Sequence, residues 1–189
     1  MKNRLLVLIL CLNSFQLFSQ TRSVHALFGS AGLGIITAPA VSGAGLAVGV
    51  GYQRTLGKPW LRLVPSLNFA SYTNQGTDDV PDAFQNSTSL KIDLNADVLS
   101  AGAFSVVVGV GLTGNHAAGL LGTGGDPGRR SSEYFSRVHL AVNGLMGFRL
   151  VPVSSRVGYE LLLVNAAFEG KRFGEEIGLF QARVLLDLR

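Results

Sequence analysis

The chain has 189 residues, of which 47% are hydrophobic and 15% are charged, with 24 glycines and a formal net charge of +4. This length suits one domain, and the apolar content excludes a disordered chain. One cysteine cannot support a disulfide scaffold. The small net charge and the lack of a run rich in Lys or Arg argue against a nucleic-acid partner.

Residues 1–20 have the composition of a secretory signal peptide. A basic start (residues 1–4) precedes an apolar run (residues 5–12) that is too short to span a membrane as a helix, and Ser19 is a small residue suited to cleavage. Cys11 lies inside the run, so we expect no lipid attachment at it. A short N-terminal core helix is the alternative, but nothing amphipathic follows. We expect cleavage after Ser19 or Gln20, which leaves residues 21–189 as a single exported domain.

The rest of the chain predicts β-strands, because apolar and polar residues alternate with a period of two and no helical period is evident. Alternation is clearest in residues 89–98, where every even position is apolar and every odd position is polar. No later stretch is long and apolar enough for a transmembrane helix. The expected strands cover residues 24–33, 44–52, 60–72, 89–98, 104–114, 134–150, 157–163 and 180–189.

The connections between these strands alternate in length. Long ones cover residues 34–43, 73–87, 115–133 and 165–175, and short ones cover residues 54–59, 100–103 and 151–155. Strands of about ten residues can cross a bilayer when tilted, and short turns at one end with long loops at the other are typical of outer-membrane barrels. The prediction is an all-β, up-and-down, antiparallel, eight-stranded transmembrane β-barrel with both termini on the short-turn, periplasmic side.

The chain resembles the small eight-stranded outer-membrane β-barrels, the porin-like and outer-membrane-protein A/X-like group, over residues 21–189. The resemblance rests on the alternating segments 46–52, 90–98 and 104–112 and on the C-terminal run 180–188. That run looks like the insertion signal read by the barrel-assembly machinery, although it ends in Leu188 and Arg189 instead of an aromatic residue. The resemblance implies an outer-membrane location, contact with membrane lipid and lipopolysaccharide, and contacts with other outer-membrane proteins.

A membrane barrel assigns the two faces of each strand to lipid and to the lumen. The residues expected to face lipid are Leu90, Ile92, Leu94, Val106, Val108, Val110, Val138, Leu140 and Val142. The polar network expected in the lumen consists of Arg62, Lys91, Asp93, Asp97, Arg137, His139, Arg149, Glu160, Arg183 and Asp187. Buried charges must be paired, and we expect an ion pair between Arg62 and Asp97.

Aromatic residues lie near both ends of the expected strands. Tyr52, Trp60, Phe104 and Phe148 adjoin the short turns, and Phe69, Tyr72, Tyr134, Phe135 and Phe168 lie near the long loops. Two aromatic girdles are expected of a spanning barrel. The alternative is a soluble lipocalin-like barrel with its polar face outside, which explains neither the girdles nor the loop asymmetry.

Two sets of residues could carry enzymatic chemistry. His139 and Glu160 are an inward-facing candidate base and orienting carboxylate, but lipid A deacylases, which are similar barrels, have a nucleophilic serine where this chain has Ala141, followed by Asn143. Outer-membrane palmitoyltransferases use loop-side His, Asp and Ser, for which His116, Asp126, Ser131 and Ser132 are the candidates.

The loops contain few other candidates for binding chemistry. Asp78, Asp79 and Asp82 lack a known metal-ligand spacing, and Arg129 and Arg130 are a basic pair that could touch lipopolysaccharide phosphates. We therefore expect no cofactor, no metal and no enzymatic activity. The sequence predicts a structural, adhesive or complex-assembling outer-membrane barrel; the alternatives are a small-solute channel and a lipid A-modifying enzyme.

Overall fold

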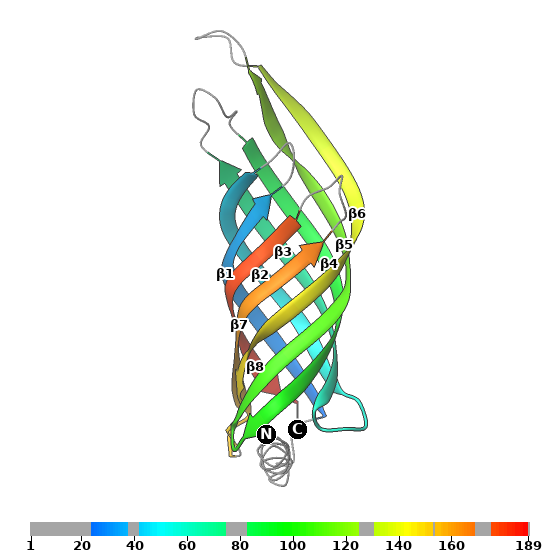
Figure 1. Ribbon diagram of the computed structural model, residues 1–189, viewed down its shortest axis with the longest axis vertical. Helices are drawn as coiled ribbons and strands as arrows, with labels where there is room; N and C mark the ends of the chain where they lie inside the picture. Colours follow the sequence, from blue (N-terminus) through cyan, green and yellow to red (C-terminus); the bar gives the residue numbers. More distant parts are fainter. Residues whose placement is uncertain are drawn as a thin grey trace, which may run out of the picture.

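The computed structural model describes residues 24–37, 42–74, 83–124, 131–152, 154–168 and 175–188. They form one closed ring of eight strands in which each strand is antiparallel to its neighbours in the sequence and β8 closes onto β1 (Figure 1). The strands are β1 (His25–Thr37), β2 (Ser42–Thr55), β3 (Leu61–Asn74), β4 (Ala83–Ala101), β5 (Phe104–Gly124), β6 (Ser131–Leu150), β7 (Val157–Phe168) and β8 (Glu175–Asp187). The predicted all-β, eight-stranded up-and-down barrel is confirmed. None of the described residues belongs to a helix that could span a membrane.

The two faces of β4 show why the sequence alternates. From Ala83 to Asp97 every odd-numbered residue is buried, and most even-numbered residues are exposed. Successive side chains of a strand point to opposite faces, so the odd set lies inside the ring and the even set outside. The alternation in the sequence therefore records the inside and outside of the barrel.

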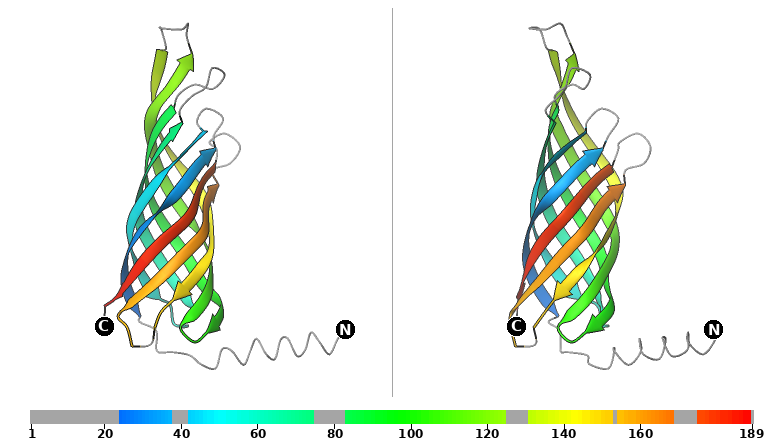
Figure 2. Two further views of the ribbon diagram at one scale, coloured as in Figure 1. Left: turned by 90° about the vertical axis from the view of Figure 1, so that its left-hand side faces the viewer. Right: turned by 60° about the vertical axis from the view of Figure 1, so that its left-hand side comes forward.

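The strands are unequal in length, which the sequence did not predict. The three consecutive strands β4, β5 and β6 have 19, 21 and 20 residues, whereas the other five have 12 to 14. Figure 2 shows the far end of the β5–β6 hairpin standing beyond the rest of the ring. One side of the barrel wall is therefore much taller than the other.

Two of the segments expected to be loops are largely strand on the tall side of the barrel. Residues 73–87 and 115–133 were expected to connect strands, but β4 already begins at Ala83, and β5 and β6 stay paired up to Gly124 and Ser131. These extensions are strands without an apolar period, because small and polar residues such as Gln85 and Ser87 take the buried positions there. Because these buried positions are not apolar, the alternation that predicts the other strands is missing here, and the segments were expected to be loops.

Four register shifts adjust the pleat of the described strands. They lie between Asp97 and Leu99 in β4, between Gly122 and Gly124 in β5, between Met146 and Gly147 in β6, and between Ala31 and Leu33 in β1. Phe180 lies in β8 at the last of these and has a φ of 52°, the positive value that a bulged non-glycine residue can be forced to take. Each bulge shifts the inside and outside positions of the strand by one residue.

Glycines on the inner face make room for polar side chains. A Cβ atom added to Gly111 would lie 2.3 Å from Oδ1 of Asp93, and one added to Gly109 would lie 2.1 Å from Oδ1 of Asn95. Both distances are far below van der Waals contact, so these positions exclude any larger residue while the polar neighbours stay in place. Close approach is the reason for glycine in these strands.

Candidate functional site: the barrel lumen and the projecting hairpin

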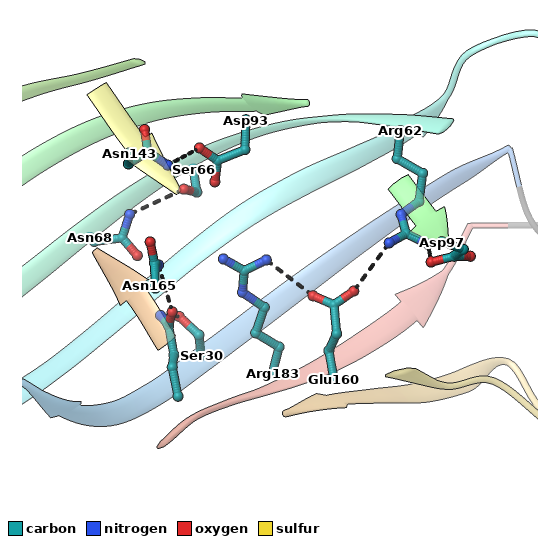
Figure 3. A network of polar contacts seen from close by, with 11 residues as sticks. Ser30, Arg62, Ser66, Asn68, Asp93, Asp97, Asn143, Glu160, Asn165 and Arg183 are labelled. Carbon is teal, nitrogen blue, oxygen red and sulfur yellow. Dashed lines mark hydrogen bonds and ion pairs between the residues drawn. The ribbon is translucent and has the colours of Figure 1, made fainter. Parts of the chain in front are cut away.

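The lower part of the lumen contains a network of four charged residues from four strands, Arg62 of β3, Asp97 of β4, Glu160 of β7 and Arg183 of β8 (Figure 3). Nη1 of Arg62 donates to Oδ1 of Asp97 at 2.7 Å, so the ion pair expected from the sequence is present. Nη2 of Arg62 lies 3.7 Å from Oε1 of Glu160, and Nη1 of Arg183 donates to Oε2 of Glu160 at 3.1 Å. The four side chains are almost fully buried.

The strand registers bring these charges together. Arg62 is directly opposite Asn95, so Asp97 is the next residue but one along the same face of β4. Glu160 is directly opposite Arg183 on β8 and opposite Arg149 on β6. Two guanidinium groups alternate with two carboxylates, which offsets the large cost of removing each charge from water.

Asp93 and a set of neutral polar side chains fill the middle of the lumen. Asn143 donates from Nδ2 to Oδ1 of Asp93 at 2.5 Å and accepts a hydrogen bond from Oγ1 of Thr113 at 3.0 Å. On the opposite wall, Gln181 donates to Oγ of Ser30 at 3.1 Å and accepts from Asn165 at 3.1 Å. These bonds link strands far apart in the sequence and fix the side chains across the lumen.

Apolar clusters complete the packing of the interior. Phe28, Val64 and Leu185 form one buried cluster, and Val107, Leu145 and Leu162 form a second. At the loop end a third cluster contains Ile36, Tyr72 and Ala83, and the hairpin residues Leu121 and Phe135 pack against it. An eight-stranded ring has room for side chains and little else, so the described lumen is a packed interior.

Most residues of the expected lumen network are buried. They are Arg62, Lys91, Asp93, Asp97, Arg149, Glu160 and Arg183. His139 and Asp187 are half-buried, and Arg137 is exposed. Arg137 shares the inward parity of Asn143, but it lies on the projecting part of β6, which among the described residues is paired with β5 and not with β7; its guanidinium lies 5.8 Å from the ring centre of Phe135. The expectation that Arg137 points into an enclosed lumen is wrong for this reason.

The nine residues expected to face lipid all have the outward parity of their strands. Leu90, Ile92, Leu94, Val110, Val138, Leu140 and Val142 are exposed, whereas Val106 and Val108 are half-buried. Large apolar side chains are exposed all around the ring, including Leu46, Val48, Val184 and Leu186. An apolar exterior around a polar interior is the reverse of a soluble barrel.

The aromatic residues follow the expected bands with two exceptions. Trp60, Phe104 and Phe148 at the short-turn end, and Phe69, Tyr134 and Phe168 towards the other end, are exposed; Tyr52 is half-buried. Phe135 has the inward parity of β6 and packs against the inner cluster of Ile36, Tyr72 and Ala83, so it belongs to no outer girdle. Tyr72 is only 1% exposed and lies inside the barrel, so it belongs to no girdle either. Its ring fits over Gly34, where an added Cβ atom would lie 3.0 Å from Cε1 of the tyrosine.

The first pair of catalytic candidates is not brought together. His139 lies opposite Asn115 in the projecting part of β6. Glu160 lies on β7 opposite Arg149, which is near the other end of β6, and it forms ion pairs with Arg62 and Arg183. Ala141, at the nucleophile position of the deacylase motif, is buried. His139 and Glu160 therefore lie too far apart to act as base and orienting carboxylate on the same substrate atom.

His116 is closer to a serine. Its Nε2 lies 3.1 Å from Oγ of Ser136, on the outer face of the hairpin, and both residues are exposed. Of its other expected companions, Ser132 is exposed, and Asp126 and the side chain of Ser131 lie outside the described residues. Asp78, Asp79, Asp82, Arg129 and Arg130 also lie outside them. The described residues contain no group of three or more His, Cys, Asp or Glu placed to hold a metal ion.

Much of the neutral part of the lumen was not predicted from the sequence. Its buried polar residues include Gln85, Ser87, Thr113, Asn115, Asn165 and Gln181. Several of them fall where strands were expected to have become loops. The parity of β4, continued upstream from Lys91, would have placed Ser89, Ser87 and Gln85 inside.

No protein-family model matches the sequence and no curated protein matches it, but the fold matches solved structures. Neisserial surface protein A (NspA) is similar at 16% identity with a TM-score of 0.65, over 88% of this chain and 98% of that chain. Ail, the attachment invasion locus protein of Yersinia pestis, is similar at 10% identity with a TM-score of 0.54, over 87% and 99%. A second Ail structure, in complex with the heparin analogue sucrose octasulfate, is similar at 9% identity with a TM-score of 0.52, over 85% and 96%. The chain thus has the fold of the small eight-stranded outer-membrane β-barrels.

Proposed function

We propose that the chain is a non-enzymatic integral outer-membrane β-barrel protein with a structural, adhesive or complex-assembling role carried by its loop end. The observation that carries the proposal is the reversed polarity of the ring, with exposed Leu, Val and Ile outside and paired charges inside. Within the closed ring each strand is paired on both sides, which satisfies its backbone hydrogen bonds there, as a bilayer demands of a spanning protein.

The proposal includes the route to the membrane and its partners. Residues 1–20 act as the cleaved signal peptide, and β8, the last strand, carries the signal for the barrel-assembly machinery. The short turns and both termini then lie on the periplasmic side, and the projecting hairpin lies outside the cell. Membrane lipid surrounds the apolar exterior, and lipopolysaccharide and other outer-membrane proteins contact the loop end.

The adhesive role draws support from the shape of the loop end. A two-stranded hairpin beyond the ring can reach past the membrane surface (Figure 2), and the fold is shared with a protein whose name refers to attachment. Residues 75–82 contain three aspartates, and residues 125–130 and 169–174 each contain one acidic and two basic residues, so these three connections together carry no net positive charge. Binding of a heparin-like polyanion is therefore not part of the proposal.

Cell fractionation and a gel-shift assay test the membrane assignment. The folded protein should sediment with outer membranes, and it should run at a different position on a denaturing gel before and after heating, because the closed ladder resists detergent at room temperature. Recovery in the soluble periplasmic fraction would contradict the proposal. Co-purification in mild detergent then identifies the partners at the loop end.

Conduction of small solutes is the less favoured function. The network of Arg62, Asp97, Glu160 and Arg183 and the apolar cluster of Ile36, Tyr72 and Ala83 fill the lumen at two levels. Recordings in planar bilayers should therefore show no steady single-channel conductance. A steady ohmic conductance from the purified protein would reverse this preference.

The contact between His116 and Ser136 keeps a lipid-modifying enzyme as a second candidate. A histidine nitrogen 3.1 Å from a serine hydroxyl is the geometry of an activated nucleophile, although no carboxylate among the described residues orients this histidine. Mass spectrometry of lipid A from cells with the parent protein and with Ser136→Ala tests it. Identical lipid A from both strains is the expected result, and a modification lost with Ser136 would establish the enzyme.

A further inference from the structure

The projecting part of β6 has a free edge. β6 is paired with β5 along its whole length, but its pairs with β7 begin only at Val142, opposite Phe168. Among the described residues, no strand lies beside residues 131–141 on that side (Figure 1). A free edge presents a row of backbone N–H and C=O groups to which another strand can add.

The side chains along this edge are arranged symmetrically about Phe135. Glu133 lies two residues before Phe135 and Arg137 two residues after it, so all three share one face of the strand. Glu133 and Arg137 are both exposed, and Arg137 extends over the ring of Phe135 at 5.8 Å. A negative and a positive side chain thus flank an aromatic residue at equal distances.

We propose that residues 131–139 pair, edge to edge and antiparallel, with the same residues of a second copy of this chain. With Phe135 at the centre of the pair, Glu133 of each copy lies directly opposite Arg137 of the other. Opposite charges and aromatic residues in directly opposed positions stabilise antiparallel strands. The contact is the same on both copies, as two-fold symmetry requires.

Charges on an edge strand can also serve to prevent pairing. Charges of one sign achieve this against a second copy, because like charges then meet across the pair. Here the two signs stand at positions that a two-fold axis exchanges, so self-pairing is the arrangement that satisfies both. If the register is shifted by one position, Glu133 of one copy no longer lies directly opposite Arg137 of the other.

The symmetry also sets the orientation of the two barrels. The two-fold axis of an antiparallel pair runs perpendicular to the sheet, and the hairpin continues the barrel wall upwards (Figure 2). The second barrel therefore points in the opposite direction, and the contact joins two facing membranes. This inference rests on the proposed outer-membrane location and gives the adhesive role a specific partner, the same protein on a neighbouring cell.

Clustering of lipid vesicles tests the inference. The full mature chain is reconstituted in phosphatidylcholine vesicles with two fluorescent labels, and energy transfer between the labels reports clustering. Glu133→Arg alone and Arg137→Glu alone should each reduce clustering about tenfold, since each places like charges opposite each other twice. Vesicles with Glu133→Arg mixed with vesicles with Arg137→Glu should cluster as the parent does, because that pairing restores opposite charges.

Arg54→Glu is the matched control. It reverses an exposed charge on β2 at the short-turn end, far from the hairpin, and should leave clustering unchanged. The inference is overturned if a folded, inserted parent does not cluster vesicles, if neither single variant reduces clustering, or if the mixture fails to restore it. The gel shift on heating separates these results from a failure of the proposed function, which would instead appear as a parent that does not insert.

Discussion

The ring and the projecting hairpin have the same alternating backbone but place side chains in different surroundings. Inside the ring, Arg62 and Glu160 are buried and paired, because eight strands enclose them. On the hairpin, Arg137 has the same inward parity and is exposed, because among the described residues this part of β6 has a paired strand, β5, on one side only. The comparison shows that parity decides which face a residue occupies, whereas the number of strands at that height decides what the face meets.

The largest effect should come from the charge network in the ring. Glu160→Leu leaves Arg62 and Arg183 with one carboxylate between them in a buried site. We expect the free energy of unfolding to fall by about 3–5 kcal/mol. Urea unfolding in detergent or vesicles, followed by the fluorescence of Trp60, the single tryptophan, measures it.

Glu133→Leu on the hairpin is the control for that variant. Glu133 is exposed, so the free energy of unfolding should change by less than about 0.5 kcal/mol. Equal losses from the two variants would mean that the ring and the hairpin do not differ in the way that burial indicates.

The outward face should respond to height above the bilayer centre. Leu94 lies in the middle of the apolar face of β4 and is 41% exposed, and Leu94→Arg should cost about 2–4 kcal/mol if this face meets lipid at the midplane. Val138→Arg, on the hairpin side of β6, should cost only about 0–1 kcal/mol, as expected near an interface. Unfolding in phospholipid vesicles compares them, and a Leu94→Arg variant as stable as the parent would refute the lipid-facing assignment.

The neutral polar layer should contribute less than the charges. Asn143→Ala removes the donor to Asp93 and the acceptor of Thr113, and we expect a loss of about 1.5–3 kcal/mol because one of the two bonds is made to a charged group. Ser136→Ala, on the same strand but on the exposed hairpin, should lose less than about 0.5 kcal/mol. The same urea titration measures both, and a neutral Asn143→Ala would show that water replaces the lost bonds.

The smallest expected effect concerns the inner glycines. Gly111→Ala places a methyl group 2.3 Å from Oδ1 of Asp93 and 2.5 Å from the backbone oxygen of Ile92, and such overpacking costs about 1–3 kcal/mol. Gly114→Ala on the same strand meets only Leu140 at 3.7 Å and should be close to neutral. If both variants are equally stable, the inner wall is less tightly packed than these distances require.

Much of the fold follows from local patterns in the sequence. The alternation in residues 89–98 predicts both the strand and the side of the barrel that each residue occupies, because the period of two is a property of the extended chain itself. The count of such segments and the alternating lengths of their connections predict the up-and-down ring. The proximity of Arg62 and Asp97 also follows, since antiparallel pairing of the strands on either side of residues 73–87 places both residues near the short-turn end.

Three features depended on the tertiary structure. The length of the β5–β6 hairpin could not be read from the sequence, because its buried positions hold small and polar residues that show no apolar period. The burial of Tyr72 and the exposure of Arg137 depend on which strands stand opposite them at that height. The bridging of two arginines by Glu160 requires the ring to close, because only closure brings β3, β7 and β8 around one lumen; parity along a strand is local, whereas these neighbours come from residues far apart in the chain.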